Sequence, residues 1–329
     1  MTNDKQSASC WHDIPVVVTG GAGFIGRHLV DQLQVLGALV TVLDDGSSGS
    51  LADVPVGVRL VEGSVADPTV VQQTVDGAAA VFHLAAMASV PACQADPQSC
   101  ERTNEVGTDV IAAAAAKVGA TMTFAGSCAV YGKEAKPPIF EDATVSPISV
   151  YAKSKLRAEQ IIQRHVGSGL RATSLRLFNV IGPGQRDNIA YAAVAANFAG
   201  RLLRGEPLRI DGDGRQTRDF VPVGFVVDTM LHVGMEPVQG AMNVGTGVPR
   251  DLLWLVSALE GIIGAQAAVH FGPPRVGDIQ QSWADITRLR DVVGEGNCKS
   301  ADDGVIEALR DLVAQRSRSR VINSEHLSA

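Results

Sequence analysis

Thr19-Gly20-Gly21-Ala22-Gly23-Phe24-Ile25-Gly26 is the stretch that decides the fold of this chain. A short β-branched apolar run at 14–18 leads into it, and a segment with helical periodicity at 24–36 follows it. Glycines at this spacing between a strand and a helix are typical of a dinucleotide-binding turn. They let backbone N–H groups and the helix N-terminus approach a pyrophosphate. The residues expected to contact the cofactor here are Gly20, Gly23, Phe24, Ile25 and Gly26.

The rest of the first half of the chain repeats this pattern. Further buried strands are predicted at 38–43, 58–62, 79–84, 121–125 and 171–178, and helices at 101–118 and 151–165. Strands that alternate with helices predict an α/β fold with a Rossmann-like, doubly wound parallel sheet.

After residue 179 this alternation ends. A loop at 181–185, a helix near 190–204 and a glycine-rich turn at 211–214 follow. We therefore expect a cofactor-binding domain at 14–180, with a returning segment near 223–247 that includes a strand at 242–245. A smaller α/β substrate lobe is expected at 181–222 and 248–315, and a solvated, partly disordered polar tail at 316–329.

Composition narrows the class of protein. The 329 residues are 46% hydrophobic, with a net charge of −7 and a pI near 5.5, which favours a globular protein without a nucleic-acid-binding surface. No apolar run approaches the roughly 20 residues needed to span a bilayer. The five cysteines have no metal-like spacing, so we expect reduced thiols, no bound metal and a cytoplasmic location.

Asp44 indicates which dinucleotide is bound. It ends the second predicted strand, 24 residues after Gly20, where a carboxylate accepts the two hydroxyls of the adenosine ribose. The same carboxylate repels a 2′-phosphate, and no arginine follows it closely. The sequence therefore predicts NAD rather than NADP.

Tyr151 and Lys155 form the chemical core of the expected site. They are four residues apart and share one face of a predicted helix. A lysine ammonium one turn away favours the phenolate, and we expect it to lower the tyrosine pKa from its usual value of about 10. Ser127 leaves the end of a parallel strand, where open α/β sheets place their ligands.

Other polar residues are weaker candidates. Asn179 also ends a strand, and Arg218 and Arg275 are candidate clamps for a second pyrophosphate, that of a substrate. His83 is interpreted as a structural histidine. Cys128 has no basic partner in the sequence pattern and is not expected to be a nucleophile.

Together these motifs resemble the extended short-chain dehydrogenase/reductase family, and within it the nucleotide-sugar 4-epimerases. The resemblance spans about residues 14–310. Besides the glycine-rich turn, Asp44, Ser127 and Tyr151 to Lys155, the matching motifs are His83-Leu84-Ala85-Ala86, Asn104-Glu105-Val106-Gly107-Thr108, Arg176-Leu177-Phe178-Asn179, Gly212-Asp213-Gly214-Arg215-Gln216-Thr217-Arg218-Asp219-Phe220, Asn243-Val244-Gly245-Thr246-Gly247 and Arg275-Val276-Gly277-Asp278.

The resemblance implies a tightly held NAD and a UDP-sugar substrate. Tyr151 would take the proton from the sugar O4, Ser127 would hydrogen-bond O4, and Lys155 would hold the nicotinamide ribose. Leu84 and Ala85 would contact the cofactor, and Asp278 the substrate. A 4-keto sugar would turn over and receive hydride on its other face, so that no net redox change occurs.

The chain also departs from the family pattern. Ser64 stands where an acidic residue is usual near the adenine, Gly126 replaces the usual serine before Ser127, and 223–226 lacks a common acidic residue. In the 4,6-dehydratases an Asp-Glu pair occupies the positions of Cys128 and Ala129. The decarboxylases usually have a glutamate at the position of Ala129. Epimerisation is therefore preferred over those activities, and a non-catalytic NAD-binding sensor is the alternative of a different class.

The resemblance also suggests which sugar and which assembly. Ser282 aligns with a position that is tyrosine in epimerases restricted to unsubstituted hexoses and small in those that accept N-acetyl sugars. The segment Ala190-Tyr191-Ala192-Ala193-Val194 resembles the N-acetylhexosamine subgroup too. UDP-N-acetylglucosamine is therefore expected, with UDP-glucose or a UDP-uronic acid as alternatives. Family members pair through two helices, here about 101–118 and 151–166, which predicts a homodimer with Ala112 to Ala116 at the contact.

Overall fold

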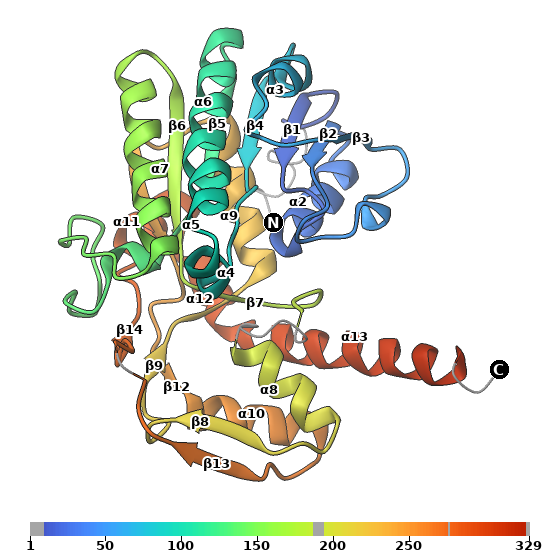
Figure 1. The fold of residues 1–329 in the computed structure, drawn as a ribbon, viewed down its shortest axis with the longest axis vertical. Helices are drawn as coiled ribbons and strands as arrows, with labels where there is room; N and C mark the ends of the chain where they lie inside the picture. Colours follow the sequence, from blue (N-terminus) through green and yellow to red (C-terminus); the bar gives the residue numbers. More distant parts are fainter. Residues whose placement is uncertain (1–9, 187–193, 276, 327–329) are drawn as a thin grey trace. The chain divides into compact units, whose positions relative to one another are not determined.

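The structure is a computed structural model that describes residues 10–186, 194–275 and 277–326 (Figure 1). The chain divides into two compact units. Unit 1 comprises Met1–Val130, Pro147–Leu177 and Val227–Met242, and unit 2 comprises Tyr131–Ser146, Phe178–Val226 and Asn243–Ala329.

This division differs from the expected one at residues 131–146, which belong to unit 2. The Tyr131 hydroxyl donates to Asn243 Oδ1 at 2.6 Å. The backbone of Ile139 bonds to the backbones of Trp283 and Asp285 at 3.0 and 2.9 Å, so this segment is tied to residues that come much later in the chain. The returning segment is 227–242, shorter than the expected 223–247.

A seven-stranded sheet forms the centre of unit 1, in the order β11-β6-β5-β4-β1-β2-β3. The pairings among β1 to β6 are all parallel, and β1 lies between β2 and β4, where the strand order reverses. The strands are β1 (Pro15–Thr19), β2 (Leu39–Asp44), β3 (Arg59–Glu62), β4 (Ala80–His83), β5 (Thr121–Ser127), β6 (Arg171–Leu177) and β11 (Gly240–Val244). The prediction of a Rossmann-like sheet is confirmed.

Helices connect these strands, and several begin at a capping side chain. Asp67, Ser89, Asp96 and Ser149 each accept a hydrogen bond from an N–H group of the first turn that they precede. The helices are α2 (Phe24–Val35), α3 (Pro68–Val75), α4 (Val90–Ala95), α5 (Pro97–Glu101), α6 (Gly107–Val118), α7 (Val150–Gly167) and α9 (Val223–Met235), with short turns η1 (Leu51–Asp53) and η3 (Cys128–Tyr131) and a π-helical turn η2 (Arg102–Val106).

The core of unit 1 covers both faces of the sheet. Val81 on β4 packs into a cluster with side chains of α3, α6 and α7. The next residue, Phe82, faces the other way, as strand alternation requires. Its ring lies 5.7 Å from that of the buried Trp11, and both rings contact Gly234 on α9. This two-sided burial explains the continuous apolar runs of the strands.

The alanines of α6 do not form the outward surface that was expected of them. Ala112, Ala114 and Ala115 are buried in the core of unit 1, and Ala113 is exposed. The helix presents these small side chains to its own sheet because they allow it to pack closely there. Of the expected contact surface at Ala112 to Ala116, the structure therefore leaves only Ala113 exposed and Ala116 partly exposed.

Unit 2 is built from short sheets and five helices in the described residues. Its strands are β7 (Asn179–Ile181), β8 (Leu208–Asp211), β9 (Thr217–Arg218), β10 (Phe220–Pro222), β12 (Arg250–Asp251), β13 (Val269–Gly272) and β14 (Gln281–Ser282). They pair as β10-β7, β12-β9-β14 and β13-β8. The helices are α8 (Val194–Leu203), α10 (Leu252–Ile263), α11 (Thr287–Val293), α12 (Glu295–Asp303) and α13 (Val305–His326).

The core of unit 2 forms where α8, α10 and α13 meet, around Phe198, Phe220, Leu255 and Leu309. Helix α13 continues to His326, so most of the segment expected to be a disordered polar tail is helical instead. Among the described residues, no helix has the length and apolarity needed to cross a membrane.

Candidate active site

The glycine-rich turn between β1 and α2 brings backbone segments unusually close together. Gly20 has a φ of +72°, and a Cβ there would lie 2.6 Å from the backbone N of Ala85. A Cβ on Gly26 would collide with the carbonyl oxygen of Gly20. Helix α2 then begins at Phe24, where its first N–H groups have no partner within the helix. The turn therefore forms a cradle suited to a pyrophosphate.

Asp44 completes this cradle from the end of β2. It is 7% exposed, and its carboxylate accepts hydrogen bonds from the N–H groups of Ala22, at 3.0 Å, and Gly46, at 2.9 Å. The carboxylate is therefore fixed against the glycine-rich turn, in the position expected for a ribose ligand.

His83 lies at the centre of a directional chain of hydrogen bonds. Thr108 Oγ1 donates to the carbonyl oxygen of Asn104 at 2.7 Å and so accepts from His83 Nε2 at 3.0 Å. On the other side, Thr19 Oγ1 accepts from the N–H of Ala85 at 3.3 Å and donates to His83 Nδ1 at 2.7 Å. The imidazole is thus neutral, with its proton on Nε2. Burial, helped by the charge of Lys155, lowers the pKa of His83 to about 3.

The three predicted catalytic residues meet at the end of β5 and the start of α7. Ser127 is the last residue of β5, and its hydroxyl forms a hydrogen bond with the phenol of Tyr151 in the first turn of α7. Lys155, one turn further on, is buried; its Nζ donates to the carbonyl oxygen of Ala125 at 2.9 Å and lies 4.8 Å from the ring centroid of Phe124.

The pKa values here correct one expectation. Burial raises the pKa of Tyr151 to about 12, and the hydrogen bond with Ser127 opposes that rise. Lys155 is not among the groups that lower it, because its ammonium is directed at β5. Burial lowers the pKa of Lys155 itself to about 8. In the protein alone, Tyr151 is therefore a protonated phenol at neutral pH.

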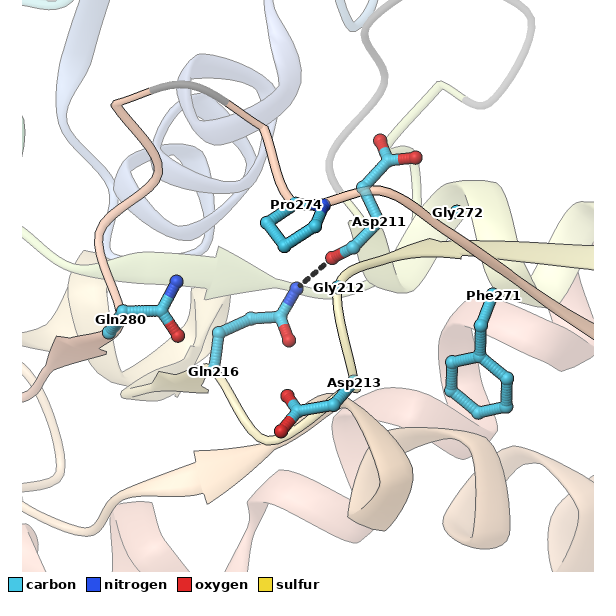
Figure 2. A pocket seen from close by; sticks show the side chains of 8 residues that line it. All are labelled: Asp211, Gly212, Asp213, Gln216, Phe271, Gly272, Pro274 and Gln280. Atoms are coloured by element: carbon cyan, nitrogen blue, oxygen red, sulfur yellow. Dashed lines mark hydrogen bonds between the residues drawn. The ribbon is translucent and has the colours of Figure 1, made fainter.

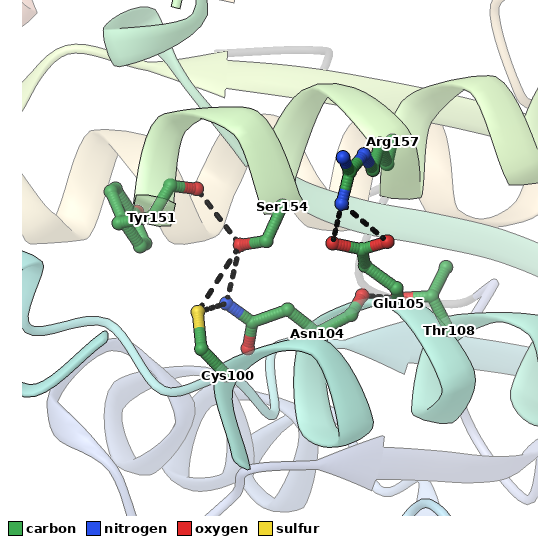
Figure 3. A network of polar contacts seen from close by, with 7 residues as sticks. All are labelled: Cys100, Asn104, Glu105, Thr108, Tyr151, Ser154 and Arg157. Atoms are coloured by element: carbon green, nitrogen blue, oxygen red, sulfur yellow. Dashed lines mark hydrogen bonds and ion pairs between the residues drawn. The ribbon is translucent and has the colours of Figure 1, made fainter. Parts of the chain in front are cut away.

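Asn104 links this site to the loop after β4, a role that the sequence motif did not reveal. Its Nδ2 donates to Ser154 Oγ at 2.9 Å (Figure 3). The same Nδ2 donates to the carbonyl oxygen of Met87 at 3.2 Å, and Oδ1 accepts from the Met87 N–H at 2.8 Å. Ser154 Oγ in turn donates to the carbonyl oxygen of Tyr151 at 2.8 Å. The available signal in the sequence was an asparagine inside a predicted helix, where this residue type is unfavourable unless its side chain has partners.

In unit 2, Arg218, Asp278 and Ser282 lie together. Arg218 on β9 donates to Asp278 Oδ1 at 3.0 Å and to the carbonyl oxygen of Ile279 at 2.7 Å. Ser282 on β14 is 6% exposed and pairs with Arg218 in a parallel register. Ser282 is therefore a buried residue of a small sheet.

Asp219 holds this arrangement together and was also missed. Its two carboxylate oxygens accept from the N–H groups of Thr246, Gly247 and Ala284 and from the Thr246 hydroxyl, at 2.8 to 3.2 Å. Burial raises the pKa of Asp219, and these hydrogen bonds oppose the rise. The carboxylate joins the segments that carry Arg218 and Ser282.

Arg275 is paired with a carboxylate. Its Nε donates to Asp211 Oδ2 at 2.6 Å, and Arg209 donates to Asp211 Oδ1 at 2.9 Å. These hydrogen bonds, that of Arg275 first, lower the pKa of Asp211. A hollow of about 330 Å³ is lined by Arg209, Arg218 and Arg275 and by the carboxylates of Asp211 and Asp278 that pair with them. The arginines outnumber the carboxylates, which favours an anion there.

A second, open hollow of about 720 Å³ lies beside this space, and Asp211 lines both hollows (Figure 2). Gln216 Nε2 donates to the carbonyl oxygen of Asp211 at 2.9 Å and fixes the turn between them. Asn179, at the start of β7, donates its N–H to the carbonyl oxygen of Asp219 at 2.9 Å. The residues 190–193 of the predicted N-acetylhexosamine motif lie outside the described part of the chain.

Comparison with known proteins shows the family of this chain. A model of the NAD dependent epimerase/dehydratase family matches residues 16–245. A UDP-glucose 4-epimerase from Mycolicibacterium smegmatis is 37% identical over 84% of this chain and 92% of its own length. UDP-glucuronic acid decarboxylase 2 from Arabidopsis thaliana is 32% identical over 85% of this chain and 64% of its own length.

Solved structures match over nearly the whole chain. A UDP-N-acetylglucosamine 4-epimerase from Methanobrevibacter ruminantium, in complex with UDP-N-acetylmuramic acid, has a TM-score of 0.87 and 31% identity over 94% of this chain and 99% of its own. A UDP-glucose 4-epimerase from Thermus thermophilus, in complex with NAD, has a TM-score of 0.83 and 31% identity over 92% and 99%.

The residues of unit 1 fit the cofactor of these relatives. Glycine at positions 20 and 26 lets the turn pack closely, because a Cβ on either would collide with the backbone, and Asp44 places a carboxylate against the turn. The chain therefore belongs to the NAD-dependent epimerase/dehydratase family, a group of extended short-chain dehydrogenases/reductases, and NAD is its cofactor.

Proposed function

We propose that the protein catalyses the 4-epimerisation of a UDP-sugar through a transient 4-keto intermediate. The observation that carries this proposal is the hydrogen bond between Ser127 and Tyr151, with Lys155 one helical turn away. A serine, a tyrosine and a lysine so placed form a proton-transfer site for a sugar hydroxyl. The names of the relatives in both comparisons support it.

Each residue then has a distinct task. Tyr151 would first lose its phenolic proton to solvent, which the positive charge of bound NAD would favour. The phenolate takes the proton from the sugar O4 and later returns it, and Ser127 donates a hydrogen bond to O4. Lys155 places a positive charge beside the nicotinamide ribose. Bound NAD supplies reversible hydride acceptance, so that no external oxidant is consumed. In unit 2, Arg218 and Arg275 would bind the diphosphate in the arginine-lined hollow. Asp278 and Asn179 would bind other polar groups of the substrate.

Two other activities of the family are less well supported by these residues. Dehydration across C5 and C6 needs an acid and a base in addition to the tyrosine. Cys128 and Ala129, which follow Ser127, offer no carboxylate; the N–H of Ala129 instead donates to Ser127 Oγ at 3.2 Å. Decarboxylation of a UDP-uronic acid is the second candidate, because the plant decarboxylase is a relative.

We propose an N-acetylhexosamine as the sugar. Ser282 is small and buried, and it neighbours Arg218, a proposed diphosphate ligand. A 4-keto sugar has to rotate between its two hydride transfers, and an acetamido group needs more room than a hydroxyl. A small side chain at this position leaves that room.

The test is to incubate the protein, with no added cofactor, with UDP-glucose, UDP-N-acetylglucosamine and their uronic acids. We expect interconversion of UDP-N-acetylglucosamine and UDP-N-acetylgalactosamine. A 4-keto-6-deoxy sugar or carbon dioxide as the main product would refute epimerisation. Turnover of UDP-glucose without any N-acetyl sugar would refute the sugar assignment only.

Ser282→Tyr tests the volume argument. We expect it to reduce turnover of the N-acetyl sugar by at least about tenfold, while any UDP-glucose activity changes far less. Gln281→Tyr is the matched control, because Gln281 is the exposed neighbour on the same strand. Equal losses on both sugars in Ser282→Tyr would indicate general damage rather than a change in specificity.

We further propose a cytoplasmic homodimer. All five cysteines lie in the described part of the chain and none is in a disulfide, as is usual in a reducing compartment. On the outward face of η2 and α6, Val106 is 46% exposed and Ala113 is exposed as well, so this face has apolar area that a second copy could cover.

A further inference from the structure

A buried ion pair stands behind the proposed catalytic residues, and the mechanism above does not use it. Arg176 on β6 donates through Nε to both oxygens of Glu159, at 3.2 Å each, and through Nη2 to Oε2 at 2.9 Å. Both side chains are less than a tenth exposed. Such a pair is costly to desolvate and contributes little to stability compared with an apolar pair of similar size.

The position of this pair relates it to the site. Glu159 follows Lys155 by one turn on α7, so both lie on one face of the helix. A Cβ at Gly126 would lie 3.1 Å from Glu159 Oε1 and 2.9 Å from the carbonyl oxygen of Leu175. Gly126 stands between Ala125, which accepts from Lys155, and Ser127. The carboxylate therefore packs against the short backbone segment that holds both catalytic side chains.

We propose that Glu159, held in place by Arg176, is a positioning residue for Lys155 and for the strand end that carries Ser127. The proposal explains why this chain has Gly126 where its family usually has serine, since a side chain there would meet the Glu159 carboxylate and the backbone of β6. It rests on the proposed function in one respect, because it takes Lys155 to be the residue that supports the proton-transferring phenol.

The charges around Lys155 support this role. The titratable groups that interact electrostatically with Lys155 are His83 on β4, Cys93 on α4, Cys100 on α5 and Glu159 on α7. Burial lowers the pKa of Lys155, and Cys100, Cys93 and Glu159 oppose that fall. Glu159 is the carboxylate among them. Burial raises its own pKa, while Arg176 and then Lys155 lower it and so favour its ionised form.

The experiment measures Lys155 directly in the NAD-free protein. Lysine labelled with ¹³C at Cε is titrated by NMR between pH 6 and 11, and Lys155→Met identifies the Lys155 signal. In the wild type we expect titration near the pKa of about 8. In Glu159→Gln we expect the midpoint to fall by about one pH unit, because the ammonium loses a nearby carboxylate.

Further variants keep the test decisive. Glu159→Gln removes the carboxylate that faces the buried charge of Arg176, which threatens the fold. The double variant Glu159→Gln/Arg176→Met removes both charges and is expected to fold with the same lowered midpoint. Glu159→Asp keeps the charge and should restore most of the wild-type value. Glu105→Gln is the control, because the Glu105–Arg157 pair also anchors α7 but does not act on Lys155 (Figure 3).

An unchanged Lys155 midpoint in the folded double variant would overturn the proposal. Loss of the fold in that variant would overturn it as well, since the pair would then serve folding alone. Activity assays of the same proteins separate the two levels of inference. If the wild type turns over no UDP-sugar, the proposed function fails, and the NMR result still decides the role of Glu159.

Discussion

Tyr151 is half-buried, forms a hydrogen bond with Ser127 and has a phenol whose pKa is raised to about 12. Tyr151→Phe removes the proton acceptor and leaves the ring and the packing of α7 in place. We expect turnover to fall by roughly 10²–10⁴-fold. The measurement is kcat together with the amount of NAD that copurifies, which should equal that of the wild type. Wild-type turnover in this variant would exclude Tyr151 as the proton-transferring residue.

His83 gives the protein a specific sensitivity to acid. Its pKa is about 3 when folded, compared with about 6.5 in an unfolded chain, so the unfolded state binds a proton first. The free energy of unfolding should therefore be unaffected by His83 above pH 6.5 and fall as the pH drops from 6.5 towards 3. The loss amounts to roughly 4 kcal/mol across that window.

His83→Gln tests this pH dependence. At pH 7 the variant should be less stable by about 1–3 kcal/mol, because the hydroxyls of Thr19 and Thr108 lose well-placed partners. Its stability should then fall less steeply than that of the wild type between pH 6.5 and 4. Urea unfolding at several pH values measures both quantities, and parallel curves for the two proteins would contradict the interpretation.

At the scale of elements, the π-helical turn η2 joins α5 to α6 and carries Asn104 at its centre. Asn104→Leu should destabilise the protein by about 2–4 kcal/mol, because the N–H and carbonyl groups of Met87 and the hydroxyl of Ser154 lose a shared partner. It should also lower kcat, since Ser154 bonds to the backbone of Tyr151.

Asp109→Asn is the matched control for that change. The Asp109–His165 contact also joins α6 to α7, but it is partly exposed and worth less than about 1 kcal/mol. Thermal unfolding and kcat are measured for both variants. Equal effects of the two substitutions would show that Asn104 is only one of several ties between the helices.

The elements of unit 1 were largely predictable, and those of unit 2 were not. Strands such as β1 and β5 are apolar runs that end at glycine or serine, and their register follows from burial on both faces. In unit 2, β9 and β14 are two residues long, too short to produce a periodic pattern. Asp219 fixes them through contacts with residues 27 and more positions away, which no local pattern reveals.

The candidate site shows the same limit. The spacing of Tyr151 and Lys155 placed them correctly on one helix face, yet the effect of the lysine on the tyrosine was wrong. It depends on where the ammonium points, and Nζ bonds to Ala125 on β5. Spacing on a helix therefore predicts proximity, but not the direction of a flexible side chain or the desolvation that dominates its pKa.

At the scale of the whole molecule, we predict a homodimer. Light scattering at micromolar concentration should give twice the chain mass of 34.4 kDa. Ala113→Arg places a large charge on the exposed side of α6 and should shift the protein towards the monomer without loss of thermal stability. Lys117→Glu, a charge change at another exposed position of α6, is the control. A monomeric wild type would end the proposal.

The two units share one chain that passes from one to the other five times, at residues 130, 146, 177, 226 and 242. On the ribosome, the sheet of unit 1 cannot be completed until β11, at Gly240–Val244, has left the exit tunnel. The two units therefore have to mature together, late in translation, and a nascent chain halted before β11 would expose the edge of β6 to other chains. Neither unit is encoded by one continuous segment of the gene, so neither can be produced by a single truncation.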